Sequence, residues 1–156
     1  MPKQTHITIA KLLRARLHDG PYSWDFTTPA GHLVISLWRD RYRPSDNHWY
    51  ALHASRRGAK HDRRRINLEQ IEAGNCGYAL LCEPVKIEPV TSSNPRQVKH
   101  CDQVMHRIVS VRREPTMWLV ELGRSVSVEE YLRTTPTQLR LFDDALGGTP
   151  GEALYD

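Results

Sequence analysis

The sequence lacks apolar runs long enough to cross a membrane. Its apolar runs are short, and Leu33–Ile35 and Tyr78–Cys82, for example, have only three and five residues, whereas a membrane-spanning helix needs about 20. The N-terminal residues also lack the apolar centre of a secretory signal. The 156 residues are enough for one domain with a real core and too few for two of ordinary size. We therefore expect a cytoplasmic protein built on a single domain.

Cysteine is scarce, and its spacing is irregular. The chain has three cysteines, Cys76, Cys82 and Cys101, an odd set that forms no disulfide framework. His100, Asp102 and His106 are further metal-ligand types near Cys101, but no C-x-x-C pair or other common zinc spacing is present. Reduced thiols are the default for a protein of the cytoplasm. We therefore predict three free thiols and no metal or other cofactor.

Motifs of catalysis are also missing. No phosphate-binding Walker loop, G-x-S-x-G or G-x-G-x-x-G sequence occurs. A nuclease would need carboxylates clustered around a metal. Asp25, Glu83 and Glu121 are available, but they belong to no recognisable array. The sequence therefore supports no catalytic residue, and a metal-dependent nuclease remains only a third hypothesis.

Positive charge is what the chain has in excess. It carries 22 Lys and Arg against 18 Asp and Glu, a net charge of +4. The segment from Asp143 onward contains four acidic residues and no basic ones, so the body before it has 22 basic and 14 acidic residues, a charge of +8. A basic body favours phosphate-bearing partners.

Hydrophobic periodicity predicts about six strands and three short helices. The helices are expected over residues 8–19, 67–73 and 127–132, the last with a capping box at Ser127 and Glu130. In the strand over residues 32–38, Leu33, Ile35 and Leu37 should face the core. The other strands are expected over residues 22–27, 48–54, 78–82, 103–111 and 117–122. We predict an α+β domain over residues 1–133, a mostly antiparallel mixed sheet or partly open barrel, followed by a tail over 134–156.

The most basic stretch, residues 55–65, is the best candidate for binding nucleic acid. Its charge density suits contacts to phosphates more than readout of bases. The polar stretch over residues 39–47 could extend the same surface; the alternative is a solvated charged loop. The predicted nucleic-acid-binding residues are Arg39, Arg41, Arg43, Arg56, Arg57, Lys60, Arg63, Arg64 and Arg65. The first predicted helix carries Lys11, Arg14, Arg16 and His18 on its exposed side.

Aromatic residues lie among these basic segments. Trp38, Trp49 and Tyr50 are predicted on strands, and aromatics beside arginines can stack on bases. The alternative is that most of them belong to the core.

The order of elements in the middle of the chain resembles the PUA-like barrels. The basic segment, the short helix 68–73, Gly74 and the strand starting at Gly77-Tyr78-Ala79 follow one another as in that group, which includes the EVE and ASCH domains. The later strands, 104–111 and 117–122, fit the same arrangement. The resemblance implies a protein that binds modified bases or RNA, and it is one of pattern without a diagnostic motif.

Residues 138–142 read Q-L-R-L-F after a Thr-Thr-Pro-Thr break. This resembles the Q-L-x-L-F peptide with which bacterial replication and repair proteins dock on the DNA polymerase sliding clamp. The resemblance implies that Leu141 and Phe142 enter an apolar cleft on the clamp, with Leu139 in support and Gln138 in a polar subsite. An aromatic and an aliphatic anchor in one pocket concentrate binding energy in few residues.

A terminal helix packed on its own domain is the alternative for this stretch. Leu139, Phe142 and Leu146 fall at i, i+3 and i+7, one face of a helix that Thr137 could cap. Two functions are therefore predicted. The first is a DNA-binding accessory protein of bacterial or phage replication or repair that docks on the clamp. The second is a PUA-like reader of a modified base or nucleotide whose C-terminal stretch only packs.

Overall fold

The computed structural model describes residues 5–18, 24–43, 49–53, 59–85, 98–115 and 117–134, without the side chains of residues 42–61. These residues form, in chain order, α1 (His6–Leu12), β1 (Arg16–Leu17), β2 (Asp25–Thr27), β3 (Leu33–Trp38), η2 (Arg39–Arg41), β4 (Tyr42–Arg43), β5 (Trp49–His53), α2 (Ala59–Glu72), β6 (Gly77–Pro84), β7 (Val98–Arg113), β8 (Met117–Ser127) and α3 (Val128–Arg133).

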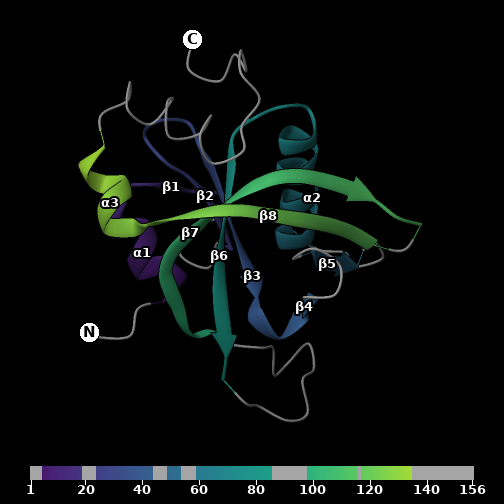
Figure 1. Cartoon of the computed structure of the whole chain (residues 1–156), viewed down its shortest axis with the longest axis horizontal. Helices are drawn as coiled ribbons and strands as arrows, with labels where there is room; N and C mark the ends of the chain where they lie inside the picture. Colours follow the sequence, from purple (N-terminus) through teal and green to yellow (C-terminus); the bar gives the residue numbers. More distant parts are fainter. Residues whose placement is uncertain are drawn as a thin grey trace.

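The strands form one mixed sheet in the order β1-β2-β3-β6-β7-β8-β5-β4 (Figure 1). All neighbouring pairs are antiparallel except β3 and β6, which run parallel with Leu33 opposite Gly77. A parallel pair needs a long crossover, and here β4, β5 and α2 lie between its two strands in the sequence. Among the described strands the sheet is open, with β1 and β4 outermost. The predicted α+β fold with a mostly antiparallel mixed sheet is confirmed.

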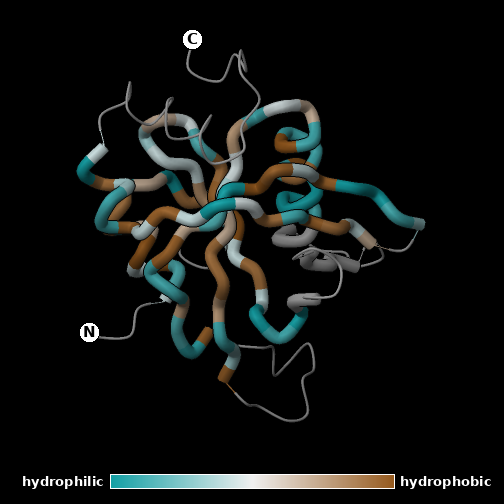
Figure 2. Tube along the Cα trace, in the orientation of Figure 1, coloured by the Kyte–Doolittle hydropathy of each residue, from teal (hydrophilic) through white to brown (hydrophobic). Residues whose placement is uncertain are grey.

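Helices cover both faces of the sheet, so its central strands are buried on both sides. On one face Ile9, Ala10 and Leu13 near α1 and Val128 and Tyr131 of α3 pack with strand residues. These strand residues are Phe26, Val34, Tyr78, Leu80, Cys82, Cys101, Met105 and Val126. On the other face Leu68 and Ile71 of α2 pack against Leu33, Ile35, Leu37, Ala79, Leu81, Ile108, Trp118, Val120 and Leu122. Figure 2 shows hydrophobic segments along the strands and along parts of the helices that cover them.

Strand β3 shows the effect of this two-sided cover. Leu33, Ile35 and Leu37 face a core as predicted, but Val34 on the opposite face is also fully buried. Alternation of apolar and polar residues identifies a strand that has one face exposed to solvent. A strand covered by helices on both faces is apolar throughout. None of the described helices has the length and apolar character needed to cross a membrane.

Helix α2 begins earlier than the sequence indicated. Residues 59–65 were expected to lie in a basic loop, yet they form the first half of a fourteen-residue helix. The spacing of apolar residues does not show this first half, because a basic residue, Arg64, occupies the buried position one turn before Leu68. Helix α3 agrees with its prediction, since the side chain of Ser127 accepts a hydrogen bond from the backbone N–H of Glu130.

The prediction of three free thiols is wrong. Cys82 on β6 and Cys101 on β7 form a disulfide, whereas Cys76 is free and buried. The two bonded residues are 19 positions apart in the sequence, and only the strand register places them directly opposite each other. No sequence spacing could have shown this pairing, because it depends on which strands become neighbours.

Candidate nucleic-acid interface and the polar network behind it

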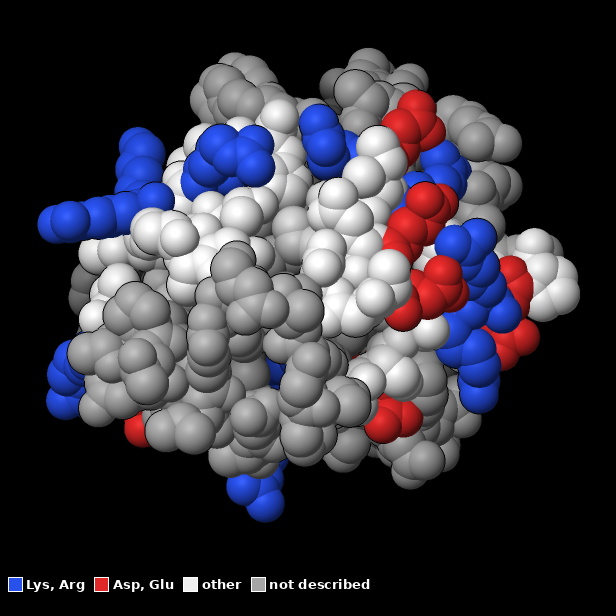
Figure 3. Space-filling view, turned by 90° about the horizontal axis from the view of Figure 1, so that it is seen from above, with Lys and Arg blue, Asp and Glu red and all other residues white. Residues whose placement is uncertain are grey.

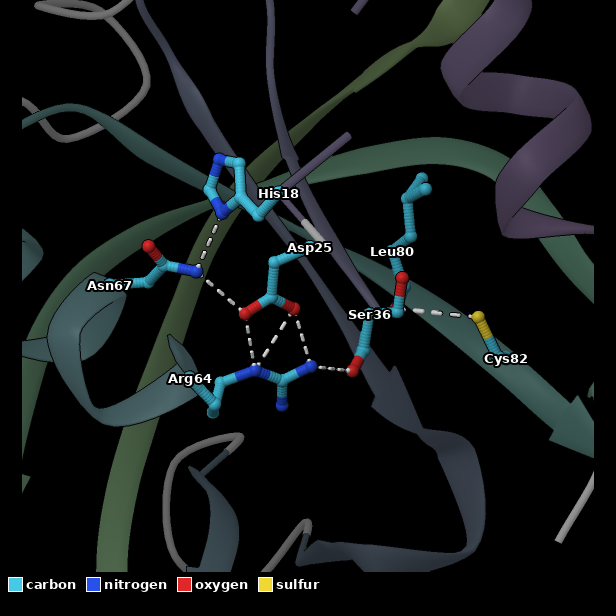
Figure 4. A network of polar contacts seen from close by, with 7 residues as sticks. All are labelled: His18, Asp25, Ser36, Arg64, Asn67, Leu80 and Cys82. Atoms are coloured by element: carbon cyan, nitrogen blue, oxygen red, sulfur yellow. Dashed lines mark hydrogen bonds and ion pairs between the residues drawn. The ribbon is translucent and has the colours of Figure 1, made fainter. Parts of the chain in front are cut away.

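The inner side of α2 carries a buried polar network in addition to its apolar residues. Arg64 and Asn67, one helical turn apart, both contact Asp25 of β2 (Figure 4). Arg64 Nε donates to Asp25 Oδ2 at 2.8 Å, and Arg64 Nη2 donates to Asp25 Oδ1 at 2.6 Å. Arg64 Nη2 also donates to the backbone carbonyl of Ser36 at 2.7 Å. A buried charged pair persists only when its hydrogen-bonding groups are satisfied in this way.

Asn67 connects this ion pair to a histidine. Its Nδ2 donates to Asp25 Oδ2 at 2.8 Å and lies 3.1 Å from Nδ1 of His18. The amide nitrogen can only donate, so Nδ1 of His18 accepts. The ring hydrogen is then on Nε2 and points to Thr27 Oγ1, 2.6 Å away. The two contacts therefore favour a single tautomer of the His18 ring.

The geometry of this network indicates a structural role. Asp25 and Arg64 are 2% and 3% exposed, and the guanidinium also lies 5.7 Å from the ring centroid of Trp24. A carboxylate that accepts bonds from Arg64 and Asn67 and is closed off from water has little capacity left to act as a base on a substrate. The network instead fixes the rotation of α2 on the sheet, and so determines which α2 side chains face outward.

Several predicted phosphate-binding arginines already have protein partners. Arg64 is excluded from the predicted surface by its burial. Arg65 Nη1 donates to Asp62 at 2.6 Å, and its side chain is only 16% exposed. Arg39 of η2 forms ion pairs with Glu83, at 2.8 Å, and with Asp102. A cation paired with carboxylates contributes less to attracting phosphate, because its charge is locally neutralised.

The other predicted residues divide into described and undescribed groups. Arg41 and Arg63 are half-buried, in η2 and α2. Trp38 is half-buried and packs against the core cluster of α1 and α3, which supports the core alternative for this tryptophan. Arg43, Trp49, Tyr50 and Lys60 lie in β4, β5 and α2, but their side chains are outside the description. Outside the described residues lie Arg56, Arg57, Gln138, Leu139, Leu141 and Phe142.

Lys11, Arg14 and Arg16, which we call the basic corner, are exposed where α1 passes into β1. Figure 3 shows that Lys and Arg dominate the charged groups at the left of the face seen from above, whereas at its right they alternate with Asp and Glu. Elsewhere on the protein, Arg113 pairs with Glu72 at 2.8 Å and Arg112 with Glu114 at 2.8 Å. The hydrogen bond and charge of Glu72 raise the pKa of Arg113.

Metal-binding groups are not brought together in the part of the chain that the structure describes. No three His, Cys, Asp or Glu residues there are placed to hold an ion. No protein-family model, curated protein or solved structure matches the chain.

Sequence reasoning missed the residues of the polar network, Asp25, Asn67 and His18. One signal was present. Arg64, Asn67, Leu68 and Ile71 follow the i, i+3, i+4, i+7 spacing of a buried helical face, and all four are buried. An arginine within such a stripe indicates a buried acidic partner, because an unpaired charge is rarely buried. The sequence could not show which acid it was.

Proposed function

We propose that the protein is a cytoplasmic DNA-binding accessory factor of replication or repair that docks on the DNA polymerase sliding clamp. The observation that carries the proposal is the sequence Q-L-R-L-F at residues 138–142. Leu141 and Phe142 are its anchors, and Gln138 and Leu139 make the supporting contacts.

The position of the peptide supports this role. The two described core clusters run from Ile9 to Tyr131, and described helices already cover both faces of the sheet. After α3, Thr134 has an extended backbone with φ −86° and ψ 133°, so the helix ends just before the tail. A peptide that follows a complete layered domain is well placed for a partner to reach it.

The charge of the body supports binding to DNA. Without its acidic end the chain has a charge of +8, and neutralising phosphates releases counterions from DNA. On α2, Arg63 is the arginine that we expect to contact phosphate. Arg64 points inward and Arg65 is paired with Asp62. Holding a DNA-binding domain at a clamp raises its local concentration on DNA, so a modest intrinsic affinity suffices.

A double substitution tests the docking peptide. Leu141→Ala with Phe142→Ala should abolish binding to a purified bacterial sliding clamp, because each lost anchor costs about 2 kcal/mol or more and the two together roughly a thousandfold in affinity. The matched control is Leu132→Ala, which truncates a leucine that is 48% exposed on α3 just before the tail. This control should bind the clamp like the parent protein.

Thermal unfolding of the same variants separates docking from packing. If residues 138–142 form a helix packed on the domain, the double variant should lose several kcal/mol of stability, as large-to-small core substitutions do. A parent protein without clamp affinity, together with that loss of stability, would overturn the proposal and favour the alternative of a nucleotide reader.

A further inference from the structure

Helices α1 and α2 end in the same backbone motif. After α1, the N–H of Ala15 donates to the carbonyl of Ala10 at 2.9 Å, and the N–H of Arg14 donates to that of Lys11 at 3.1 Å. After α2, Asn75 donates to Gln70 and Gly74 to Ile71, both at 3.0 Å. These paired bonds define the Schellman motif, which satisfies carbonyls at a helix end.

The motif requires one residue in the left-handed region, and the two helices place different residues there. Gly74 has φ +112°, whereas Arg14 has φ +55° and is the one described residue other than glycine with a positive φ. Glycine adopts this conformation without a steric penalty, but a side chain with a Cβ does not. Arg14 therefore makes the end of α1 less stable than a glycine would.

No described contact compensates for this strain. The Arg14 side chain is exposed, and within the described ranges no hydrogen bond or ion pair holds it. Non-glycine residues in strained backbone conformations cluster at functional sites. The strain of Arg14 is therefore a reason to ask what its side chain binds.

The charged residues closest to Arg14 in the sequence are basic. Lys11 precedes it by three residues, and Arg16 follows on the outermost strand β1. Residues 1–18 contain four Lys or Arg and no Asp or Glu. Like charges on neighbouring residues repel one another and are best relieved by an anionic partner.

We propose that the basic corner, Lys11, Arg14 and Arg16, is a contact site for the phosphate backbone of duplex DNA, separate from the segment of residues 56–65. This inference rests on the proposed DNA-binding function. Such contacts fix the position of a protein on DNA without reading sequence. Arg14 is exposed at the end of α1 and lies between Lys11 and Arg16 in the sequence.

Two substitutions at Arg14 separate its charge from its strain. Arg14→Gln removes the charge and keeps the strained backbone. It should lower the salt dependence of binding to a 20-base-pair duplex by about 1 in log–log slope and leave the melting temperature unchanged. Arg14→Gly should lower the slope equally and raise the melting temperature by about 3 °C, because the strain is removed. Changing all three cations of the corner to Gln should lower the slope by about 3.

Matched controls come from the same fold. Arg112→Gln removes an exposed arginine paired with Glu114 and should not change the slope. Gly74→Arg should lower the melting temperature by about 3 °C, since it places a side chain in the equivalent strained position. Its binding to DNA should not weaken.

The outcomes distinguish this inference from the proposed function. A parent protein that binds DNA with the same slope as Arg14→Gln and the triple variant overturns the inference alone. A parent that binds no DNA overturns both the inference and the DNA-binding part of the proposed function. Binding to vesicles of anionic phospholipid in place of duplex DNA also overturns the inference.

Discussion

Arg64 of α2 and Asp25 of β2 form a two-armed ion pair that is almost completely removed from water, with the side chains 3% and 2% exposed. Desolvating two charges is costly, and the Coulomb attraction offsets that cost only while both partners are present. The pair therefore stabilises one position of α2 on the sheet. Any position that separates the two buried charges is less stable.

Removing one partner of this pair should strongly destabilise the protein. We expect Arg64→Ala to cost about 3–5 kcal/mol, because the carboxylate of Asp25 is left buried and uncompensated. The neighbouring Arg63 is half-buried but takes no part in this ion pair, so Arg63→Ala should change stability by about 0.5 kcal/mol or less. Urea unfolding followed by circular dichroism measures both variants.

The same two variants separate the loss of a phosphate contact from damage to the fold. Replacing Arg63, Arg64 and Arg65 together would combine a lost phosphate contact with a damaged fold, so a loss of binding would have two causes. Arg63→Ala alone should weaken binding to DNA at an unchanged melting temperature. If Arg64→Ala proves as stable as Arg63→Ala, the Arg64–Asp25 ion pair does not hold α2 in place on the sheet.

Gly77 of β6 lies directly against the side chain of Ile71 of α2. A Cβ on this residue would be 2.6 Å from Cδ1 and 2.8 Å from Cγ1 of Ile71 on α2, closer than non-bonded carbons can approach. We expect Gly77→Ala to destabilise the fold by about 1–3 kcal/mol through overpacking. Shortening the opposing side chain in Gly77→Ala with Ile71→Val should recover part of the loss. Chemical denaturation of the single and double variants tests this, and an Ile71→Val change that only adds to the loss would contradict it.

The disulfide between Cys82 and Cys101 should contribute to stability. It closes a loop across 19 residues of sequence, for which the entropy of the unfolded chain predicts about 3 kcal/mol. Protein purified without reductant should show one reactive thiol when unfolded, from Cys76, and three after reduction. Its urea midpoint should fall on reduction. Three reactive thiols before reduction, in protein exposed to air, would contradict the pairing.

Local patterns predicted most of the elements, whereas their pairings required the structure. The alternation in β3 and the capping box at Ser127 are encoded within a few residues, so both were predicted. The start of α2 was missed because helical periodicity was counted with apolar residues alone, and Arg64 occupies one of the buried positions. Asp25, Asn67 and the Cys82–Cys101 pair depend on which strand lies beside which. The strain at Arg14 could not be foreseen either, because glycine is the residue that usually marks that position.

The parallel pairing of β3 with β6 at the centre of the sheet affects how the chain is made. During synthesis β1, β2 and β3 leave the ribosome well before β6, and all of β4, β5 and α2 must follow first. Synthesis adds about 5–20 residues per second, so some seconds pass between the synthesis of β3 and that of β6. During this time the edge of β3 that will pair with β6 is open, and the side chains of Leu33, Val34 and Ile35 lack their final contacts. An apolar strand with an open edge is a template for pairing with other chains. The interval in which misfolding is favoured therefore falls during translation. It ends when β6 pairs with β3 and Arg64 of α2 forms its ion pair with Asp25.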